Sequence, residues 1–212
     1  SSVSLTVKNN LNHSIYKNEI KIFGQYTEHP ISKENFKGIN YSYFSFKSKN
    51  KYLANQMCKS ILESKNEKQL IEVHNRPYLI TSIIKKVGNI PVSIFFHNDP
   101  KDMKGSQSVL ERENILKRCV AVFCVSAYIK KQFLEGLGTS SEKVFVLYNG
   151  VQRKPKKFPL KNKEIIFVGR LVFSKGAHLY VDVAKSLASQ FPDWTFSLLG
   201  SFKLGDNKKS NK

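Results

Sequence analysis

The sequence predicts an α/β protein: a Rossmann-like, doubly wound parallel sheet domain followed by the beginning of a second Rossmann-like domain. The first observation is a series of short β-branched and aromatic runs, such as Pro91–Phe96 and Ile165–Val168, typical of strands covered on both faces. The second is that segments with helical apolar spacing alternate with these runs. The third is that a glycine or a polar cluster closes several of them and marks where each strand ends.

The first predicted domain covers residues 1–151 and is expected to be incomplete at its start. Residues 3–17 are ambiguous, because their apolar spacing fits the tail of a helix while a short strand at Val3–Val7 is also compatible. The strands expected after them are Glu19–Phe23, Ile39–Phe46, Leu70–Val73, Pro91–Phe96, Val120–Val125 and Lys143–Tyr148. The helices expected between strands are 51–64, 78–87, a segment of about ten residues ending near Arg118, and one that Ser126 caps and Gly138 stops.

Residues 152–163 differ in composition and predict a linker between two domains. They contain two prolines and six basic residues, Arg153, Lys154, Lys156, Lys157, Lys161 and Lys163. The second domain, residues 164–212, is expected to begin with the buried strand Ile165–Val168, and its helix to be capped by Ser174. That helix has apolar residues at three- and four-residue spacing, at Ala177, Val181, Ala184 and Ala188. A further strand is expected at Thr195–Leu199.

The net charge of +19 commonly indicates a nucleic-acid partner or an anionic membrane surface. Here 30 of the 35 basic residues are lysine, a bias that an AT-rich genome produces without selection for any partner. Arginine pairs that read bases and basic stripes interleaved with aromatic residues are not evident in the sequence. We therefore expect no nucleic-acid partner, and peripheral association with an anionic membrane stays open.

The cysteines indicate a reducing compartment. Cys58, Cys119 and Cys124 are odd in number and form no C-x2-C pair, and the last two flank a predicted strand, so we expect them in the core. The longest apolar runs span about seven residues, far short of the roughly 20 that a membrane helix needs. The expected location is the cytoplasm, with the inner face of the cell membrane as an alternative.

A candidate phosphate site lies between the strand Ile165–Val168 and the helix that follows it. Gly169 and Arg170 follow the strand directly, and Lys175 and Gly176 precede the helix. Ligands of open α/β sheets bind at the carboxyl ends of strands, and a helix amino terminus adds N–H donors and partial positive charge. A diphosphate would fit these groups, but in a chain with 35 basic residues these two cations, taken alone, are more simply explained as solvated loop residues.

Three further stretches complete a recognisable pattern. Glu72–Pro77 reads Glu-Val-His-Asn-Arg-Pro, Phe96–Pro100 reads Phe-His-Asn-Asp-Pro, and Tyr148–Val151 reads Tyr-Asn-Gly-Val. Together with the glycine and cation pairs, their order and spacing resemble the retaining glycosyltransferases of the GT-B fold, specifically glycosyltransferase family 4. The resemblance covers nearly all of residues 19–200. It implies that the first domain receives an acceptor, that the second holds a nucleotide-sugar, and that the reaction occurs in the cleft between them.

The resemblance also implies roles for individual residues. Arg170 and Lys175, with Gly169 and Gly176, would bind the donor diphosphate and stabilise the charge of the leaving group. His97 would hydrogen-bond an acceptor or donor sugar hydroxyl. His97, Arg170 and Lys175 are thus the candidate catalytic residues. For His97 the alternative is a strand-end histidine bonded to backbone.

The acceptor side has four further candidates besides His97. They are His74, Asn75, Arg76 and Asn98. For the first three, a purely structural role in a turn is favoured, because asparagine and proline are ordinary turn residues. Asp99 precedes a proline and is expected only to shape the loop. We expect no metal, since no carboxylate, histidine or cysteine cluster has suitable spacing, and no cofactor, since a nucleotide-sugar is a substrate.

The sequence departs from the family pattern at both ends. The family opens with a glycine-rich loop, but no glycine precedes Gly24, and its Glu-x7-Glu motif is missing because no glutamate follows Glu164. We therefore expect a fragment that is inactive alone.

The leading hypothesis for the longer enzyme is a retaining, hexosyltransferase-type glycosyltransferase acting on a glycan or lipid-linked acceptor in cell-surface polysaccharide or lipopolysaccharide biosynthesis. One alternative is a non-enzymatic basic protein that binds nucleic acid or an anionic membrane. Another is a different nucleotide-dependent α/β enzyme.

Overall fold

The computed structural model describes residues 2–26, 34–40, 48–64, 68–138, 142–151 and 160–202. The chain divides into two compact units, Ser1–Gln152 and Arg153–Lys212. Most of the strand predicted at Ile39–Phe46, residues 41–46, and most of the predicted linker lie outside the described residues.

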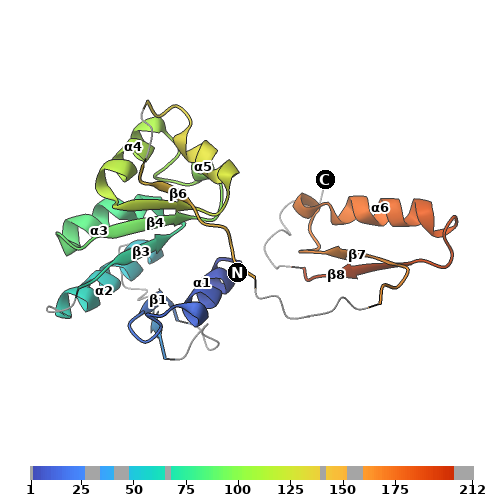
Figure 1. Cartoon of the computed structure of the whole chain (residues 1–212), viewed down its shortest axis with the longest axis horizontal. Helices are drawn as coiled ribbons and strands as arrows, with labels where there is room; N and C mark the ends of the chain where they lie inside the picture. Colours follow the sequence, from blue (N-terminus) through green and yellow to red (C-terminus); the bar gives the residue numbers. More distant parts are fainter. Residues whose placement is uncertain are drawn as a thin grey trace. The chain divides into compact units, whose positions relative to one another are not determined.

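The first unit alternates helices and strands (Figure 1). Its helices are α1 (Ser2–His13), α2 (Lys49–Glu63), α3 (Ile80–Val87), α4 (Val109–Arg118) and α5 (Ala127–Leu134), with short 3-10 turns η1 (Pro77–Leu79) and η2 (Pro100–Asp102). Its strands are β1 (Ile22–Gln25), β2 (Phe36–Ile39), β3 (Ile71–His74), β4 (Val92–Phe96), β5 (Ala121–Cys124) and β6 (Val144–Val146). The ambiguous start is therefore helical. Strand β2 ends at Ile39, where the predicted strand was to begin, and α5 ends at Leu134, before the predicted stop at Gly138; the other elements lie within a few residues of their predicted positions.

Every strand pair in the described residues is parallel, which confirms the predicted α/β class with parallel sheets. Strands β3, β4, β5 and β6 form one sheet in chain order, and β1 pairs with β2 in a separate two-stranded sheet. Right-handed crossovers between parallel strands that follow in chain order place the connecting helices on one face. The core of the first unit lies on that face.

Alternate residues of the four central strands fill this core, because successive side chains of a strand point to opposite faces. The strand residues in the core are Ile71, Val73, Val92, Ile94, Phe96, Val122, Cys124 and Val144. Buried side chains of the connecting helices pack on them, namely Ile80, Ile83, Val87, Ile115, Ile129 and Phe133. Each such aliphatic or aromatic side chain contributes about 1.5–3 kcal/mol relative to exposure, so this cluster is the main source of stability.

The prediction that Cys119 and Cys124 lie in the core is confirmed. Both are free and buried, and so is Cys58. Burial raises the pKa of Cys119 and of Cys124 to about 12, so both remain uncharged thiols at neutral pH. They are packing residues.

Arg112 on α4 ties the segment after β4 to the end of α5. Its guanidinium is buried and donates to four backbone carbonyl oxygens, those of Ser106, Gln107, Phe133 and Glu135, at 2.6–3.2 Å. A buried cation is tolerated only when its donors are satisfied. The segment that carries His97 is thereby anchored to the helical layer.

The second unit consists of β7 (Glu164–Val168), the 3-10 turn η3 (Phe173–Lys175), α6 (Ala177–Ala188) and β8 (Thr195–Leu199). Strands β7 and β8 pair in parallel, and α6 runs alongside them (Figure 1). The predicted apolar positions of α6 are partly buried from Ala177 to Ala184. The tyrosine hydroxyl of Tyr180 donates to the carbonyl of Ile165 at 2.7 Å, which fixes the helix over β7.

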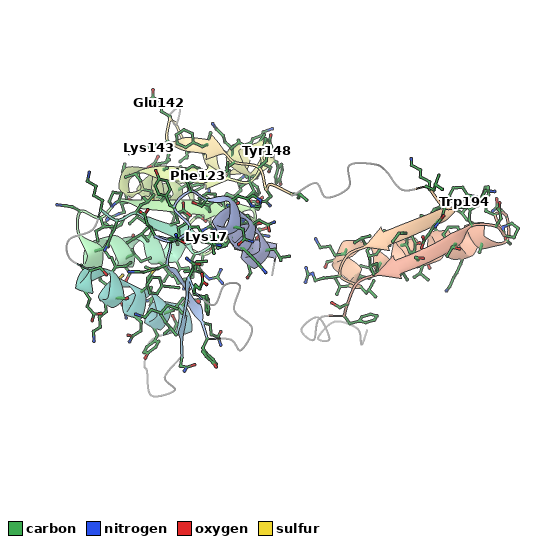
Figure 2. All side chains as sticks on the ribbon, turned by 60° about the horizontal axis from the view of Figure 1, so that its bottom comes forward. Lys17, Phe123, Glu142, Lys143, Tyr148 and Trp194 are labelled. Carbon is green, nitrogen blue, oxygen red and sulfur yellow. The ribbon has the colours of Figure 1, made fainter. Side chains whose placement is uncertain are left out.

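Two expectations for this unit are wrong. Ser174 does not cap α6, because it lies inside η3 and Gly176 occupies the N-cap position with φ of 76°, in the left-handed region that glycine adopts readily. Strand β7 is not buried on both faces: Ile166 is 48% and Val168 71% exposed. Among the described residues, β7 pairs only with β8, and α6 is the only helix of this unit. Trp194, labelled in Figure 2, is likewise 39% exposed.

In the part of the chain that the structure describes, no helix combines the length and apolar character needed to cross a bilayer.

Candidate functional site

The carboxyl ends of β3 and β4 bring two polar clusters of the sequence together. The strands are parallel and His74 pairs in register with Phe95, so the residues after them emerge at the same sheet edge. His74, Asn75 and Arg76 follow β3, and His97 and Asn98 follow β4. The five acceptor-side candidates predicted from the sequence therefore lie in one place.

Asn75 links the two strand ends. Its backbone adopts φ of 51°, a left-handed conformation that asparagine tolerates better than most residues. Its side-chain oxygen accepts a hydrogen bond from the backbone N–H of His97 at 2.8 Å, and its amide nitrogen donates to the side-chain oxygen of Asn98 at 2.9 Å. The turn role predicted for this residue is confirmed, and the turn serves to hold His97.

The imidazoles of His74 and His97 contact each other directly. Nδ1 of His74 and Nε2 of His97 are 3.0 Å apart, within hydrogen-bond distance. The ring centres are 5.3 Å apart and the planes differ by 25°, so the rings meet edge to edge rather than face to face. Nε2 of His74 faces a carboxylate oxygen of Glu72 at 3.5 Å. The three side chains thus form a chain from Glu72 through His74 to His97.

His97 is neutral in this environment. Burial, the larger cause, and the neighbouring His74 together lower its pKa from the ordinary value of 6.5 to about 4. A neutral imidazole has one N–H donor and one acceptor nitrogen. His97 can therefore both donate and accept hydrogen bonds at neutral pH.

Aromatic side chains support this histidine pair from the sheet. The ring of His74 is nearly parallel to that of Phe95, at 5.0 Å between centres, and Phe95 stacks on Phe123 at 4.5 Å. Phe123 is labelled in Figure 2. Because Phe95 is buried, the stack restricts the rotamer of His74 and hence the direction of its Nδ1.

A cavity of about 340 Å³ lies beside this cluster. The residues that line it come from β1, β2, α2, β3, η1 and α3 and include Glu72, His74 and Arg76. Most of the remaining lining is apolar, with side chains such as Phe23, Tyr52 and Leu79. A cavity with apolar walls and a few charged or polar groups at one side is suited to an organic ligand.

The remaining residues of the two clusters have simpler contacts. Arg76 is exposed and donates to the carbonyl oxygen of Asn75 at 2.8 Å, which leaves guanidinium donors for solvent or a ligand. Asp99 is the N-cap of η2 and accepts from the backbone N–H of Lys101 at 2.9 Å, so the expectation that it shapes the loop is confirmed.

In the second unit, Gly169, Arg170, Lys175 and Gly176 lie on the segment between β7 and α6. Gly169 donates its backbone N–H to the carbonyl of Leu199 at 3.0 Å, and the side chains of Arg170 and Lys175 are exposed. Lys175 ends η3, directly before the left-handed Gly176 that begins α6. Two cations and a helix amino terminus are therefore placed on one short segment, as an anion site requires.

Glu72 belongs to the first cluster through its contact with His74, and Arg112 holds the segment after β4; neither residue has a role predicted from the sequence. Glu72 stands two residues before His74, and that spacing places both side chains on one strand face, which is a signal that the sequence contains. Arg112 has no such signal, because two of its four carbonyl partners, Phe133 and Glu135, lie 21 and 23 residues away in the sequence. Among the described residues, no group of three histidine, cysteine, aspartate or glutamate side chains is arranged to hold a metal ion.

Comparisons with known proteins place this geometry in a family context. The chain is 25% identical over 159 residues to YtcC of Bacillus subtilis (strain 168), a protein named as a glycosyltransferase, and 23% identical over 214 residues to spore coat protein SA of the same strain. The alignments cover 66% and 92% of this chain, but only 39% and 55% of those proteins, so the chain spans about half the length of these relatives or less.

A solved structure, the crystal structure of accessory secretory protein 1,2 and 3 in Streptococcus pneumoniae, aligns with 71% of this chain and 36% of that chain, with a TM-score of 0.44 and 10% identity.

The family profile covers most of the first unit. Residues 19–154 match Glycosyltransferase Family 4, a range that begins before β1 and includes both polar clusters and the cavity. The motifs that suggested this family in the sequence therefore lie largely inside the matched range. The chain belongs to glycosyltransferase family 4.

Proposed function

We propose that the natural protein carrying this chain transfers a sugar from a nucleotide-sugar donor to a glycan or lipid-linked acceptor, with retention of anomeric configuration. The expected setting is the synthesis of a cell-surface polysaccharide or lipopolysaccharide in the cytoplasm. In this proposal the first unit binds the acceptor. Arg170 and Lys175 of the second unit bind the donor diphosphate.

The observation that carries the proposal is the polar cluster beside the cavity of the first unit. His74 and Arg76 line a space of about 340 Å³, which is large enough for a sugar-sized ligand, and His74 contacts the neutral His97. Sugar recognition requires groups that form hydrogen bonds with hydroxyls, and a neutral imidazole supplies an acceptor nitrogen for a hydroxyl hydrogen.

The second unit supports the donor side of the proposal. Bond cleavage at the donor sugar leaves a nucleoside diphosphate, and cations fixed near that group stabilise the charge that develops. Arg170 precedes η3 and Lys175 is its last residue; both side chains are exposed, and neither has a carboxylate partner among the described residues. Both are therefore available to an anionic ligand.

The test measures release of nucleoside diphosphate and formation of product with a panel of nucleotide-sugars and acceptors, using the natural-length protein. We expect Arg170→Ala and Lys175→Ala each to lower kcat/KM at least tenfold, because a charged hydrogen bond is worth about 1.5–3 kcal/mol. Lys185→Ala, which removes an exposed lysine from the far end of α6, is the matched control and should leave kcat/KM unchanged. Unaltered kinetics in both site variants would refute the diphosphate assignment.

A further inference from the structure

Glu72, His74 and His97 are aligned on one face of the sheet. Glu72 and His74 are two residues apart on β3, and His97 stands two residues beyond Phe95, the register partner of His74 on β4. The nitrogen separation of 3.0 Å and the edge-to-edge ring arrangement direct an N–H of one imidazole at the lone pair of the other. Either ring could be the donor of this hydrogen bond.

The carboxylate of Glu72 determines which of the two rings donates the hydrogen bond. If Nδ1 of a neutral His74 donated to His97, the lone pair of His74 would be on Nε2. It would face a carboxylate oxygen of Glu72 at 3.5 Å, and the contact would be repulsive because both atoms carry negative charge density. If His97 donates instead, His74 places its N–H toward Glu72, and the contact is attractive. The hydrogen bond of one ring nitrogen sets which nitrogen carries the proton.

We propose that Glu72 and His74 are positioning residues that hold His97 in the tautomer protonated on Nε2, so that Nδ1 is an acceptor for a substrate hydroxyl. The hydroxyl part of this statement rests on the proposed sugar transfer, whereas the tautomer does not. No described residue is bonded to Nδ1 of His97, so this nitrogen remains available. The low pKa of His97, caused mainly by burial, agrees with a neutral ring.

The arrangement also determines what His97 offers to a substrate. An unconstrained imidazole presents either a donor or an acceptor at Nδ1, whereas one whose Nε2–H is committed to a neighbour presents only an acceptor. A substrate hydroxyl must then donate its own hydrogen, which fixes the direction of the O–H bond. Glu72 thus acts on the hydroxyl bound at Nδ1 of His97 through two imidazoles.

The first experiment reads the tautomer directly, with no substrate. Long-range proton–nitrogen NMR spectra of the 212-residue chain are recorded at about pH 8, above the ordinary range of imidazole pKa values, so that neutral rings are compared. We expect Nε2 of His97 to be protonated and Nδ1 unprotonated. A His97 that carries its proton on Nδ1 would overturn the proposal.

Two variants test the role of Glu72. Glu72→Leu removes the acceptor that orients His74, and we expect His97 to populate both tautomers. Glu63→Leu removes an exposed carboxylate from the end of α2 and should leave the His97 signals unchanged. Both positions are exposed, and amide spectra report whether each variant is folded. An unaltered His97 tautomer in folded Glu72→Leu would refute the positioning role.

The transfer assay supplies the functional arm. We expect His97→Ala to lower kcat/KM at least tenfold, Glu72→Leu to lower it severalfold, and Glu63→Leu to leave it unchanged. A Glu72→Leu enzyme with mixed tautomers and full kcat/KM would refute the acceptor role of Nδ1. If the unmodified natural-length protein transfers no sugar, the proposed function fails, and so does the proposal that Nδ1 of His97 accepts a hydrogen bond from a substrate hydroxyl. The NMR spectra still determine the tautomer of His97 in that case.

Discussion

His97 combines a buried imidazole with a neighbouring imidazole, and both features disfavour its protonation. Its folded-state pKa of about 4 lies below the ordinary value of 6.5. Between these two values the unfolded chain binds a proton at this position and the folded chain does not. The unfolded state is therefore favoured increasingly as the pH falls through this window. Above the window, His97 makes no difference to the pH dependence of stability.

This sign leads to a prediction for His97→Asn. The free energy of unfolding of the unmodified chain should fall between about pH 6.5 and about pH 4 more steeply than that of the variant. Urea unfolding at a series of pH values measures both curves. His13→Asn, which removes an exposed imidazole from α1, serves as the control and should follow the unmodified chain. Parallel curves for His97→Asn and the unmodified chain would show that His97 is protonated equally in both states.

The sequence identified most of the residues of the first cluster, for a physical reason. Parallel strands end at a common edge, so polar residues that follow neighbouring buried strands are brought together, as happens for His74 and His97. The hydrogen bond between them depends on strand register, which a single sequence does not specify. Glu72 was missed because its relevance follows only once the partner of His74 is known.

At the scale of elements, the two predicted serine caps had different outcomes. The hydroxyl of Ser126 accepts from the backbone N–H of Ile129 at 3.2 Å, as predicted for the start of α5. Ser174 instead lies inside the 3-10 turn η3, and α6 begins two residues later at Gly176, which has a left-handed backbone conformation. Serine and glycine are both found at N-caps, so the pattern alone did not show which one begins α6.

A pair of substitutions tests this assignment of helix starts. Ser108 and Glu111 form a reciprocal capping box at α4, with hydrogen bonds of 3.2 and 3.0 Å. Ser108→Ala should lower the free energy of unfolding by about 1 kcal/mol. Ser174→Ala should change it by less than about 0.5 kcal/mol, as expected for a surface substitution away from a cap. Urea denaturation of both variants makes the comparison, and a larger loss at Ser174 would restore it as a cap.

At the scale of the whole molecule, the two units differ in how much apolar surface they bury. All the fully buried hydrophobic residues among the described residues belong to the first unit, and the last of them in the chain is Val144. In the second unit, strand residues such as Val168 and Leu199 are 71% and 63% exposed. Periodicity predicted the strands and helix of this unit correctly. It did not predict their exposure, because burial depends on which other elements cover a strand.

The difference in burial predicts a difference in local stability within the 212-residue chain. Opening free energies are highest where many apolar contacts must be broken and lowest where backbone hydrogen bonds lie near solvent. Amides in β4 and β5 should therefore exchange with deuterium at least tenfold more slowly than those in β7 and β8, a difference of about 1.4 kcal/mol or more. Hydrogen exchange followed by NMR resolves the individual amides.

Substitutions at one buried and one exposed strand residue test whether apolar burial is the cause of the difference in protection. Ile94 is fully buried, so Ile94→Val should lower protection throughout β3–β6 by about 0.5–1.5 kcal/mol. Val168 is largely exposed, so Val168→Ala should leave the protection of β7 and β8 nearly unchanged, because little apolar area is lost from a core. Equal protection in both units, or a large loss from Val168→Ala, would mean that the second unit buries β7 in solution.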